Sequence, residues 1–202
     1  DLHSFPTRRS SDLDPETPME ETALALDQAV RMGKALYVGI SNYNKADTEK
    51  MIEIFEKLKT PFILNQPSYS MLNRWIETDG LRDYAYDKGF GLAVFSPLYQ
   101  GFLTDKYLNG VPADSRVGKG NTWIGNELND SMLKKLNALN DIAKSRGQKL
   151  SQMALSWVLR ENKVTTVLIG ASKPEQIIEN SQAVYKTVFS PRDRKSTRLN
   201  SS

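Results

Sequence analysis

Residues 36–66 read LYVGISNYNKADTEKMIEIFEKLKTPFILNQ, and this stretch decides the fold class. Residues 36–40 form a short apolar run with little alternation, which is typical of a strand buried on both faces of a parallel sheet. Apolar residues then recur at helical spacing and predict a helix over 45–58. A second short strand is predicted at 62–64. Strand, helix and strand in this order are the unit from which parallel α/β sheets are built.

The same pattern extends outward in both directions along the chain. Upstream, Thr17 followed by Pro18 and Glu20 predicts a capped helix that stops near Gly33. Downstream, strands are predicted at 92–95 and 165–169, and helices around 81–87, at 131–145, after a cap at Ser151 and from Pro174, the last burying Ile177, Ile178 and Val184. Four strands, each followed by a helix, predict right-handed crossovers and a parallel sheet.

Two α/β architectures are compatible with this pattern. A complete (β/α)8 TIM barrel needs eight strands, so four strands between residues 14 and 191 would make an incomplete barrel. A small doubly wound sheet is the alternative, although no G-x-G-x-x-G turn supports it. The pattern alone leaves both open.

The charge of the chain is concentrated at its end. The formal net charge is +3. Residues 192–202 carry four basic side chains against Asp193, whereas residues 1–13 and 14–191 are each neutral. A basic face for nucleic acid is therefore not expected on the body of the protein. The apolar runs are too short to span a bilayer, and a cytoplasmic protein fits.

The composition also excludes several kinds of site. The chain has no cysteine, and its one histidine, His3, lies outside the patterned part. Disulfides, Cys-ligated or His-ligated metals and Ser-His catalysis are therefore not expected. Residues 1–13 and 192–202 lack periodicity and resemble translated adapter strings, so both ends are predicted to be foreign or disordered, with 14–191 as the single domain.

Small polar residues mark the ends of all four predicted strands. They are Ser41-Asn42, Asn65-Gln66, Ser96 and Ser172. Strand ends are commonly polar because they meet loops. In a barrel, however, the loops after the strands form one mouth, where amides and hydroxyls could bind a carboxamide and Phe95 could stack on a flat ring.

The last predicted helix begins with a candidate anion site. Gly170, Ser172 and Lys173 precede Pro174 at a helix N-terminus, where backbone N–H groups and the dipole favour phosphate. An ordinary helix cap has the same pattern. Lys106 and Arg116 could bind a second phosphate or be solvated loop charges.

Four segments resemble the second half of the aldo-keto reductases. They are KALYVGISNY (34–43), NQPSY (65–69), FSPLYQGFLTDKY (95–107) and LIGASKPEQIIEN (168–180). The resemblance spans about residues 14–191 in one register, and TPMEET, SYSMLNRWIE and KYLNGVPADSR look most like the bacterial glyceraldehyde 3-phosphate reductase branch, with potassium-channel β subunits as a related branch. It implies strands five to eight of a (β/α)8 barrel and an NADP cofactor.

The resemblance also implies a role for each matched residue. The nicotinamide would meet Ser41, Asn42, Gln66 and, by stacking, Phe95; the pyrophosphate would meet Ser96, Pro97, Leu98, Gln100 and Gly101, with Lys106 and Arg116 closing over the dinucleotide. The adenosine 2′-phosphate would meet Gly170, Ser172 and Lys173, and the adenine and its ribose would meet Gln176, Glu179 and Asn180.

The family transfers a hydride from NADPH to an aldehyde or ketone, assisted by a Tyr, a Lys-Asp pair and a His. Those residues belong to the first four strands of the family, so no residue of this sequence matches a catalytic position. We therefore expect the chain alone to be inactive. Its unpaired strand edges would favour association into a homo-oligomer. A cofactor-sensing regulatory subunit with the same fold is the alternative function.

Overall fold

The computed structural model describes residues 13–112, 118 and 127–201, which divide into two compact units. Unit 1 contains the chain up to Ser68, Trp75–Phe95 and Lys163–Thr166. Unit 2 contains Tyr69–Arg74, Ser96–Asn162 and the chain from Val167 onward. The predictions for residues 1–12 and for Arg116 lie outside the described residues.

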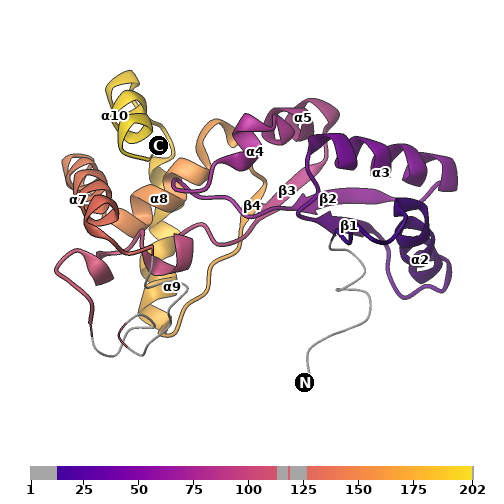
Figure 1. Ribbon diagram of the computed structural model, residues 1–202, viewed down its shortest axis with the longest axis horizontal. Coiled ribbons are helices and arrows are strands. Elements are labelled where there is room, and N and C mark those ends of the chain that lie inside the picture. The colour runs from indigo at the N-terminus through magenta and orange to yellow at the C-terminus, as the bar shows by residue number, and fades with distance from the viewer. Residues whose placement is uncertain (1–12, 113–117, 119–126, 202) are drawn as a thin grey trace. The chain divides into compact units, whose positions relative to one another are not determined.

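The strands form one four-stranded sheet in the order β1-β2-β3-β4 (Figure 1). The strands are β1 (Val38–Ser41), β2 (Phe62–Gln66), β3 (Gly91–Val94) and β4 (Thr166–Val167). β2 pairs in parallel with both β1 and β3, as predicted from the alternation of strands and helices. Because the strands are parallel, the carboxyl ends of β1, β2 and β3 meet at one edge.

Helices fill the connections between the strands. In unit 1 these are α2 (Met19–Arg31), α3 (Lys45–Leu58), α4 (Trp75–Thr78) and α5 (Leu81–Lys88). In unit 2 they are α7 (Asp130–Ser145), α8 (Leu150–Val158), α9 (Pro174–Ser181) and α10 (Pro191–Ser201), with short 3-10 turns η1 (Tyr99–Gly101), η2 (Asp105–Tyr107), η3 (Arg160–Asn162) and η4 (Gln182–Lys186). None of the helices described is long and apolar enough to cross a membrane.

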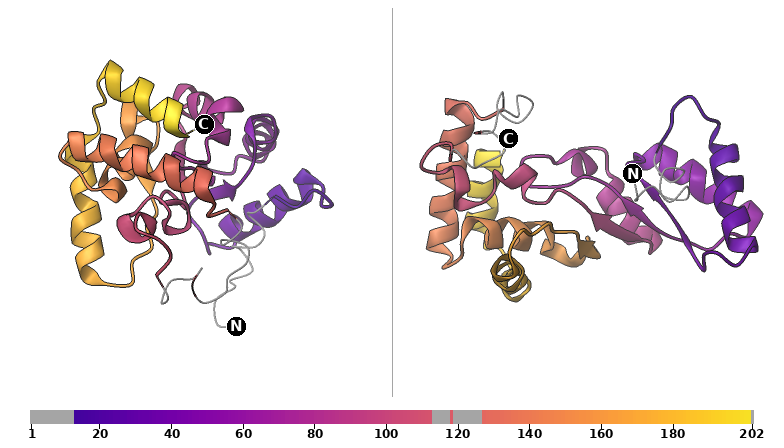
Figure 2. Two further views of the ribbon diagram at one scale, coloured as in Figure 1. Left: turned by 60° about the vertical axis from the view of Figure 1, so that its left-hand side comes forward. Right: turned by 90° about the horizontal axis from the view of Figure 1, so that it is seen from below.

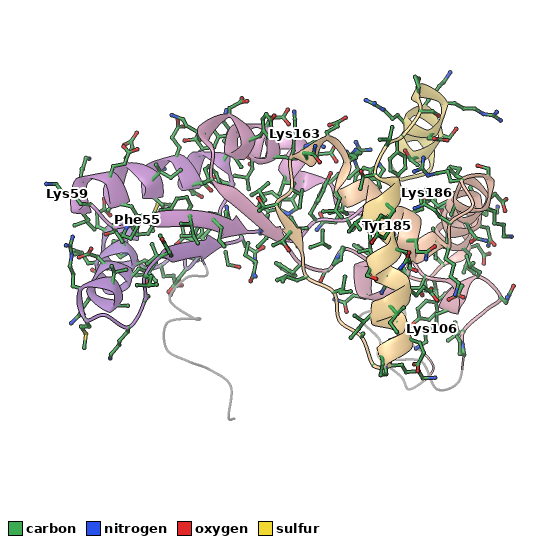
Figure 3. The ribbon with its side chains drawn as sticks, turned by 180° about the vertical axis from the view of Figure 1, so that it is seen from behind. Phe55, Lys59, Lys106, Lys163, Tyr185 and Lys186 are labelled. Carbon is green, nitrogen blue, oxygen red and sulfur yellow. The ribbon has the colours of Figure 1, made fainter. Side chains whose placement is uncertain are left out.

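The core of unit 1 lies between α2, α3 and β1. Phe55 of α3 is buried in it and stacks on Phe62 with 5.6 Å between ring centroids. Helix α3 has the predicted bounds. Its C-cap residue is Lys59, whose φ of 57° is left-handed and lets the Thr60 N–H bond back to the Phe55 carbonyl (Figure 3). Aromatic packing therefore fixes α3 against the first two strands.

Several element boundaries in unit 1 differ from the prediction. Strand β1 begins at Val38, because Val38 is the first residue opposite β2; Leu36 and Tyr37 precede the ladder and are exposed. Helix α2 lacks the predicted capping box. Pro18 is its N-cap residue. The Thr17 hydroxyl donates instead to Asp14 at 2.8 Å, so it does not cap the helix.

The core of unit 2 is built around α8, which contacts α7, α9 and η4. All residues of α8 except Gln152 are buried. Ser151 is therefore an interior helix residue and not the predicted cap. Instead the Gln152 side chain accepts the N–H of Lys149 at 3.0 Å. Helix α8 therefore begins two positions earlier than a cap at Ser151 implies, because Lys149 is its N-cap residue.

The predicted buried side of α9 is also wrong. Ile177 and Ile178 are 54% and 67% exposed, and Val184 of η4 is 56% exposed. α9 and η4 instead reach α8 through polar bonds: Gln152 Nε2 donates to the Glu179 carbonyl at 3.0 Å, and Ser156 Oγ donates to the Ala183 carbonyl at 2.7 Å. Hydrogen bonds to the backbone of α9 and η4 thus determine which side of them faces α8, and their apolar side chains are exposed.

Helix α10 covers most of residues 192–202, the tail that the sequence predicts to be foreign or disordered. Its start is a reciprocal cap, because Ser190 Oγ accepts the Asp193 N–H and the Asp193 carboxylate accepts the Ser190 N–H, both at 3.1 Å. α10 packs along α7, and Thr197 is 1% exposed (Figure 2). The sequence shows no apolar periodicity here. Capping and two ion pairs, Asp193 with Arg146 and Arg194 with Glu161, connect the helix to the rest of unit 2.

Candidate functional site

The predicted nicotinamide residues meet at the carboxyl ends of β1 and β2. Ser41 and Gln66 are directly paired in the ladder. The Gln66 carbonyl accepts both the Ser41 hydroxyl at 3.1 Å and the Asn42 N–H at 3.2 Å. The structure therefore brings Ser41, Asn42 and Gln66 together, although the first predicted strand ends later than expected and β2 includes Asn65 and Gln66.

Asn42 has a backbone conformation that few residues tolerate. Its φ is 60°, in the left-handed region, where a short polar side chain is favoured over a bulky one. Its Oδ1 accepts the Ser68 N–H at 3.3 Å. The side chain of Asn42 is therefore held over the end of β2, with its amide group at the surface.

Phe95 follows directly after β3. Its N–H donates to the Pro67 carbonyl at 3.1 Å, and Ser68 and Phe95 form an isolated parallel bridge. Phe95 is half-buried. The bridge extends the sheet by one step beyond β2 and β3 and places Phe95 at the same edge as Gln66.

In unit 2, residues 96–101 form a tight backbone turn. Ser96, Tyr99 and Gln100 have φ values of 54°, 46° and 56°, and Gly101 has φ 94°. The Leu98 carbonyl accepts the N–H groups of both Gly101 and Leu103. Such conformations cost free energy and concentrate at ligand sites, so this turn is a candidate for close contact with a bound molecule.

The side chains in and after this turn differ in exposure. Pro97 is buried and Gln100 exposed. Burial raises the pKa of Tyr99, and a hydrogen bond with Glu127 raises it further, so this tyrosine stays protonated at neutral pH. Lys106 lies in η2 and is exposed, with Nζ 5.9 Å from the centroid of the Tyr107 ring (Figure 3).

Three donors converge on one atom at the start of α9. Gln176 Oε1 accepts the Ser172 N–H at 2.8 Å, the Ser172 hydroxyl at 3.3 Å and the Lys173 N–H at 3.3 Å. Lys173 is exposed, and a Cβ on Gly170 would meet no described atom within 4 Å. The start of α9 therefore holds an oxygen acceptor beside open space and a cationic side chain.

The remaining predicted residues lie further along α9. Glu179 pairs with Lys149, and this carboxylate raises the pKa of the Lys149 ammonium. Asn180 is buried, with 8% of its surface exposed. The predicted residues thus form three local groups: the strand ends of unit 1, the turn at 96–101, and α9. Across the ranges that the structure describes, His, Cys, Asp and Glu side chains form no group of three suited to a metal ion.

The chain belongs to the aldo/keto reductase family, whose sequence model matches residues 10–198. The match confirms the resemblance and gives the chain the α/β fold of that family. Among curated proteins, it is 50% identical over 185 residues to the L-glyceraldehyde 3-phosphate reductase of Escherichia coli K12, covering 90% of this chain and 54% of the relative.

More distant relatives agree with this assignment. A putative voltage-gated potassium channel subunit beta of Schizosaccharomyces pombe is 37% identical over 177 residues, covering 85% of this chain and 51% of that protein. The crystal structure of a thermostable aldo-keto reductase in complex with the inhibitor epalrestat superposes with a TM-score of 0.67 at 26% identity, covering 93% of this chain and 56% of the other. The chain spans about half the length of the curated relatives that it matches.

Proposed function

We propose that this chain supplies the cofactor-binding half, strands five to eight of a (β/α)8 barrel, of an NADPH-dependent reductase of small aldehydes or ketones. Family membership and 50% identity to a glyceraldehyde 3-phosphate reductase support the reaction class. The observation that carries the proposal is the convergence of the Ser172 and Lys173 N–H groups on a single oxygen, beside the exposed Lys173 ammonium.

The start of α9 fits the 2′-phosphate of NADP. Gln176 Oε1 occupies the position of an acceptor oxygen, so the donors already have the orientation that a phosphate oxygen requires. Gly170 leaves room for a bulkier group than an amide. Lys173 adds a positive charge that would attract the 2′-phosphate of NADP, a group that NAD lacks.

The strand ends of unit 1 fit the other end of the cofactor. Ser41, Asn42 and Gln66 would hold the nicotinamide carboxamide, which has both a donor and an acceptor, and Phe95 would cover the ring. When bound, the nicotinamide supplies the hydride that reduces the carbonyl carbon. The residues of this chain bind and orient the cofactor, and the turn at 96–101 would lie along its pyrophosphate.

None of the tyrosines near these groups matches the family's proton donor. Tyr43 and Tyr69 are buried in the core, and Tyr37 is exposed just before β1. Tyr99 is held in the strained turn with a raised pKa. We therefore assign no catalytic residue within this chain.

A cofactor-sensing regulatory subunit is the second candidate, supported by the 37% identity to a putative potassium channel subunit beta. The higher identity to a reductase favours an enzyme. Measurable turnover of an aldehyde by a protein that carries this chain would separate the two, since a sensing subunit binds NADPH with little turnover.

The phosphate assignment is tested by titrating the chain and its Lys173→Ala variant with NADPH and with NADH. The variant should lose roughly tenfold in NADPH affinity and less than twofold in NADH affinity, because only NADPH carries the 2′-phosphate. Lys134→Ala, which removes an exposed lysine of α7, is the matched control. Equal losses for both cofactors would remove Lys173 from this role, and no binding of either by the unaltered chain would contradict the proposed function.

A further inference from the structure

Asn65 is a fully buried amide next to the proposed nicotinamide site. It belongs to β2, directly before Gln66, and none of its surface is exposed. In the ladder it stands opposite Ile40, one step before the Ser41 and Gln66 pair. A polar side chain in this position needs partners, because burial removes its hydrogen bonds to water.

Both N–H groups of the Asn65 amide are used. Nδ2 donates to the Tyr43 carbonyl at 2.9 Å and to Thr48 Oγ1 at 3.0 Å. Thr48 is itself fully buried, and its hydroxyl lies 3.4 Å from the same Tyr43 carbonyl. Because a primary amide has two N–H donors, Asn65 joins β2 to the loop after β1 and to α3 at once.

The acceptor of the same amide has no partner among the described residues. Asn65 Oδ1 is buried without a hydrogen bond. An unpaired buried oxygen destabilises the fold, and an apolar residue of similar size would avoid that cost. The two N–H groups therefore serve a purpose that an apolar residue cannot.

The loop that Asn65 holds shows what its two N–H groups contribute. The Tyr43 carbonyl directly follows Asn42, whose φ of 60° is strained. On the other side, the Asn42 N–H and Oδ1 are bound to Gln66 and Ser68. The left-handed residue is thus fixed from both ends, by the end of β2 on one side and by Asn65 on the other. Without the Asn65 bond, the loop could relax toward an ordinary backbone conformation.

We propose that Asn65 is a positioning residue, which fixes the strained Asn42–Tyr43 loop through its bond to the Tyr43 carbonyl and so orients Ser41 and Asn42 toward the nicotinamide carboxamide. The inference rests on the proposed function. It concerns the nicotinamide end of the cofactor alone, because every group involved belongs to unit 1.

The experiment compares NADPH with 2′,5′-ADP, which lacks the nicotinamide half. The unaltered chain should bind NADPH more tightly, and the ratio of the two affinities measures the nicotinamide contribution. Asn65→Asp should lower this ratio by roughly tenfold while the 2′,5′-ADP affinity stays within twofold, because both N–H donors are lost. Thr48→Val should lower the ratio by less, and Thr48→Ser, which keeps the hydroxyl, should restore it.

Phe55→Leu is the control for a general loss of packing, because Phe55 belongs to the same core cluster as Tyr43 while its side chain makes none of the hydrogen bonds that hold the Asn42–Tyr43 loop. It should lower the unfolding temperature and leave the ratio unchanged. If Asn65→Asp does not fold, Thr48→Val and Thr48→Ser decide the question. An unchanged ratio in the Asn65 and Thr48 variants, or an equal fall in Phe55→Leu, overturns the inference while the proposed function stands. A ratio of one in the unaltered chain also overturns it, and absence of binding to both nucleotides rejects the proposed function and the inference with it.

Discussion

Arg146 and Asp193 form an ion pair of 2.9 Å that ties the end of α7 to α10. The Arg146 side chain is only 9% exposed. Its second terminal nitrogen donates to the backbone carbonyls of Lys186 and Val188, at 2.9 and 3.1 Å. One guanidinium therefore joins the end of α7 to residues 186–193, which lie at least 40 positions further along the sequence.

Replacing Arg146 should release α10. Arg146→Ala leaves the half-buried Asp193 carboxylate without its cation, and breaking such a pair costs about 3–5 kcal/mol in the free energy of unfolding. Arg146→Lys should restore only part, because an ammonium cannot make the forked bonds of a guanidinium. Urea unfolding followed by circular dichroism measures both.

Lys144→Ala is the control for this prediction. Lys144 pairs with Asp141 at 3.8 Å, and both side chains are at least 70% exposed, so its loss should cost less than about 1 kcal/mol. Similar losses for Arg146→Ala and Lys144→Ala would show that the pair with Asp193 does not hold α10.

The same ion pair predicts a dependence of stability on pH. Burial alone would raise the pKa of Asp193, but hydrogen bonds from Ser190 and the charge of Arg146 outweigh it and hold the pKa below its ordinary value. A carboxyl with a lowered folded pKa stabilises the fold above its unfolded pKa and loses this effect as pH falls through the folded one. The gap in unfolding temperature between the unaltered chain and Asp193→Asn should therefore be constant at neutral pH and shrink below about pH 4. A gap that persists at lower pH would contradict it.

Phe95 should contribute to cofactor binding through its ring. Phe95→Ala is expected to weaken NADPH by about 1 kcal/mol, near fivefold, through lost aromatic contact, and Phe95→Trp should recover it. Fluorescence titration with NADPH, with 2′,5′-ADP as the reference ligand, measures both variants. If neither substitution changes the NADPH affinity, Phe95 contributes only to packing at the end of β3.

An apolar surface on α9 and η4 predicts that the chain associates with itself. Its members are the exposed apolar residues of α9, of η4 and of the segment just after it, namely Ile177, Ile178, Val184, Tyr185 and Val188. Contiguous exposed apolar side chains favour association. Sedimentation velocity should show oligomers that Ile178→Lys with Val188→Lys reduces, whereas Leu24→Lys, on an exposed position of α2, should not. A monomer at all concentrations would exclude association.

The elements that the sequence predicted well are those whose local signals agree. Helix α3 has apolar spacing, an Asn44 cap and a polar outer face, and its bounds were predicted to the residue. α9 was placed correctly at Pro174, yet its buried face was not, because a bond from Gln152 to its backbone and one from Ser156 to the backbone of η4 determine the side that packs. Contacts with side chains from a distant segment cannot be predicted from the local sequence pattern.

The candidate site could likewise be predicted only in part from the sequence. Polar residues at strand ends could be recognised from the sequence, and the parallel ladder brings Ser41, Asn42 and Gln66 together. Asn65 was recognised only as another polar strand end. Its buried position and its bond to Tyr43 depend on how far β2 extends and on the packing of α3, neither of which the local sequence encodes.

The acceptor at the start of α9 bears on how a cofactor would be selected. Gln176 already satisfies the N–H groups of Ser172 and Lys173, so an arriving phosphate would replace one set of hydrogen bonds by another with little net gain. What a phosphate brings that the neutral amide lacks is charge, acting on Lys173 and on the helix dipole. The choice between NADPH and NADH would then be a Coulombic one, strongest in dilute buffer and fading as added salt screens the helix end.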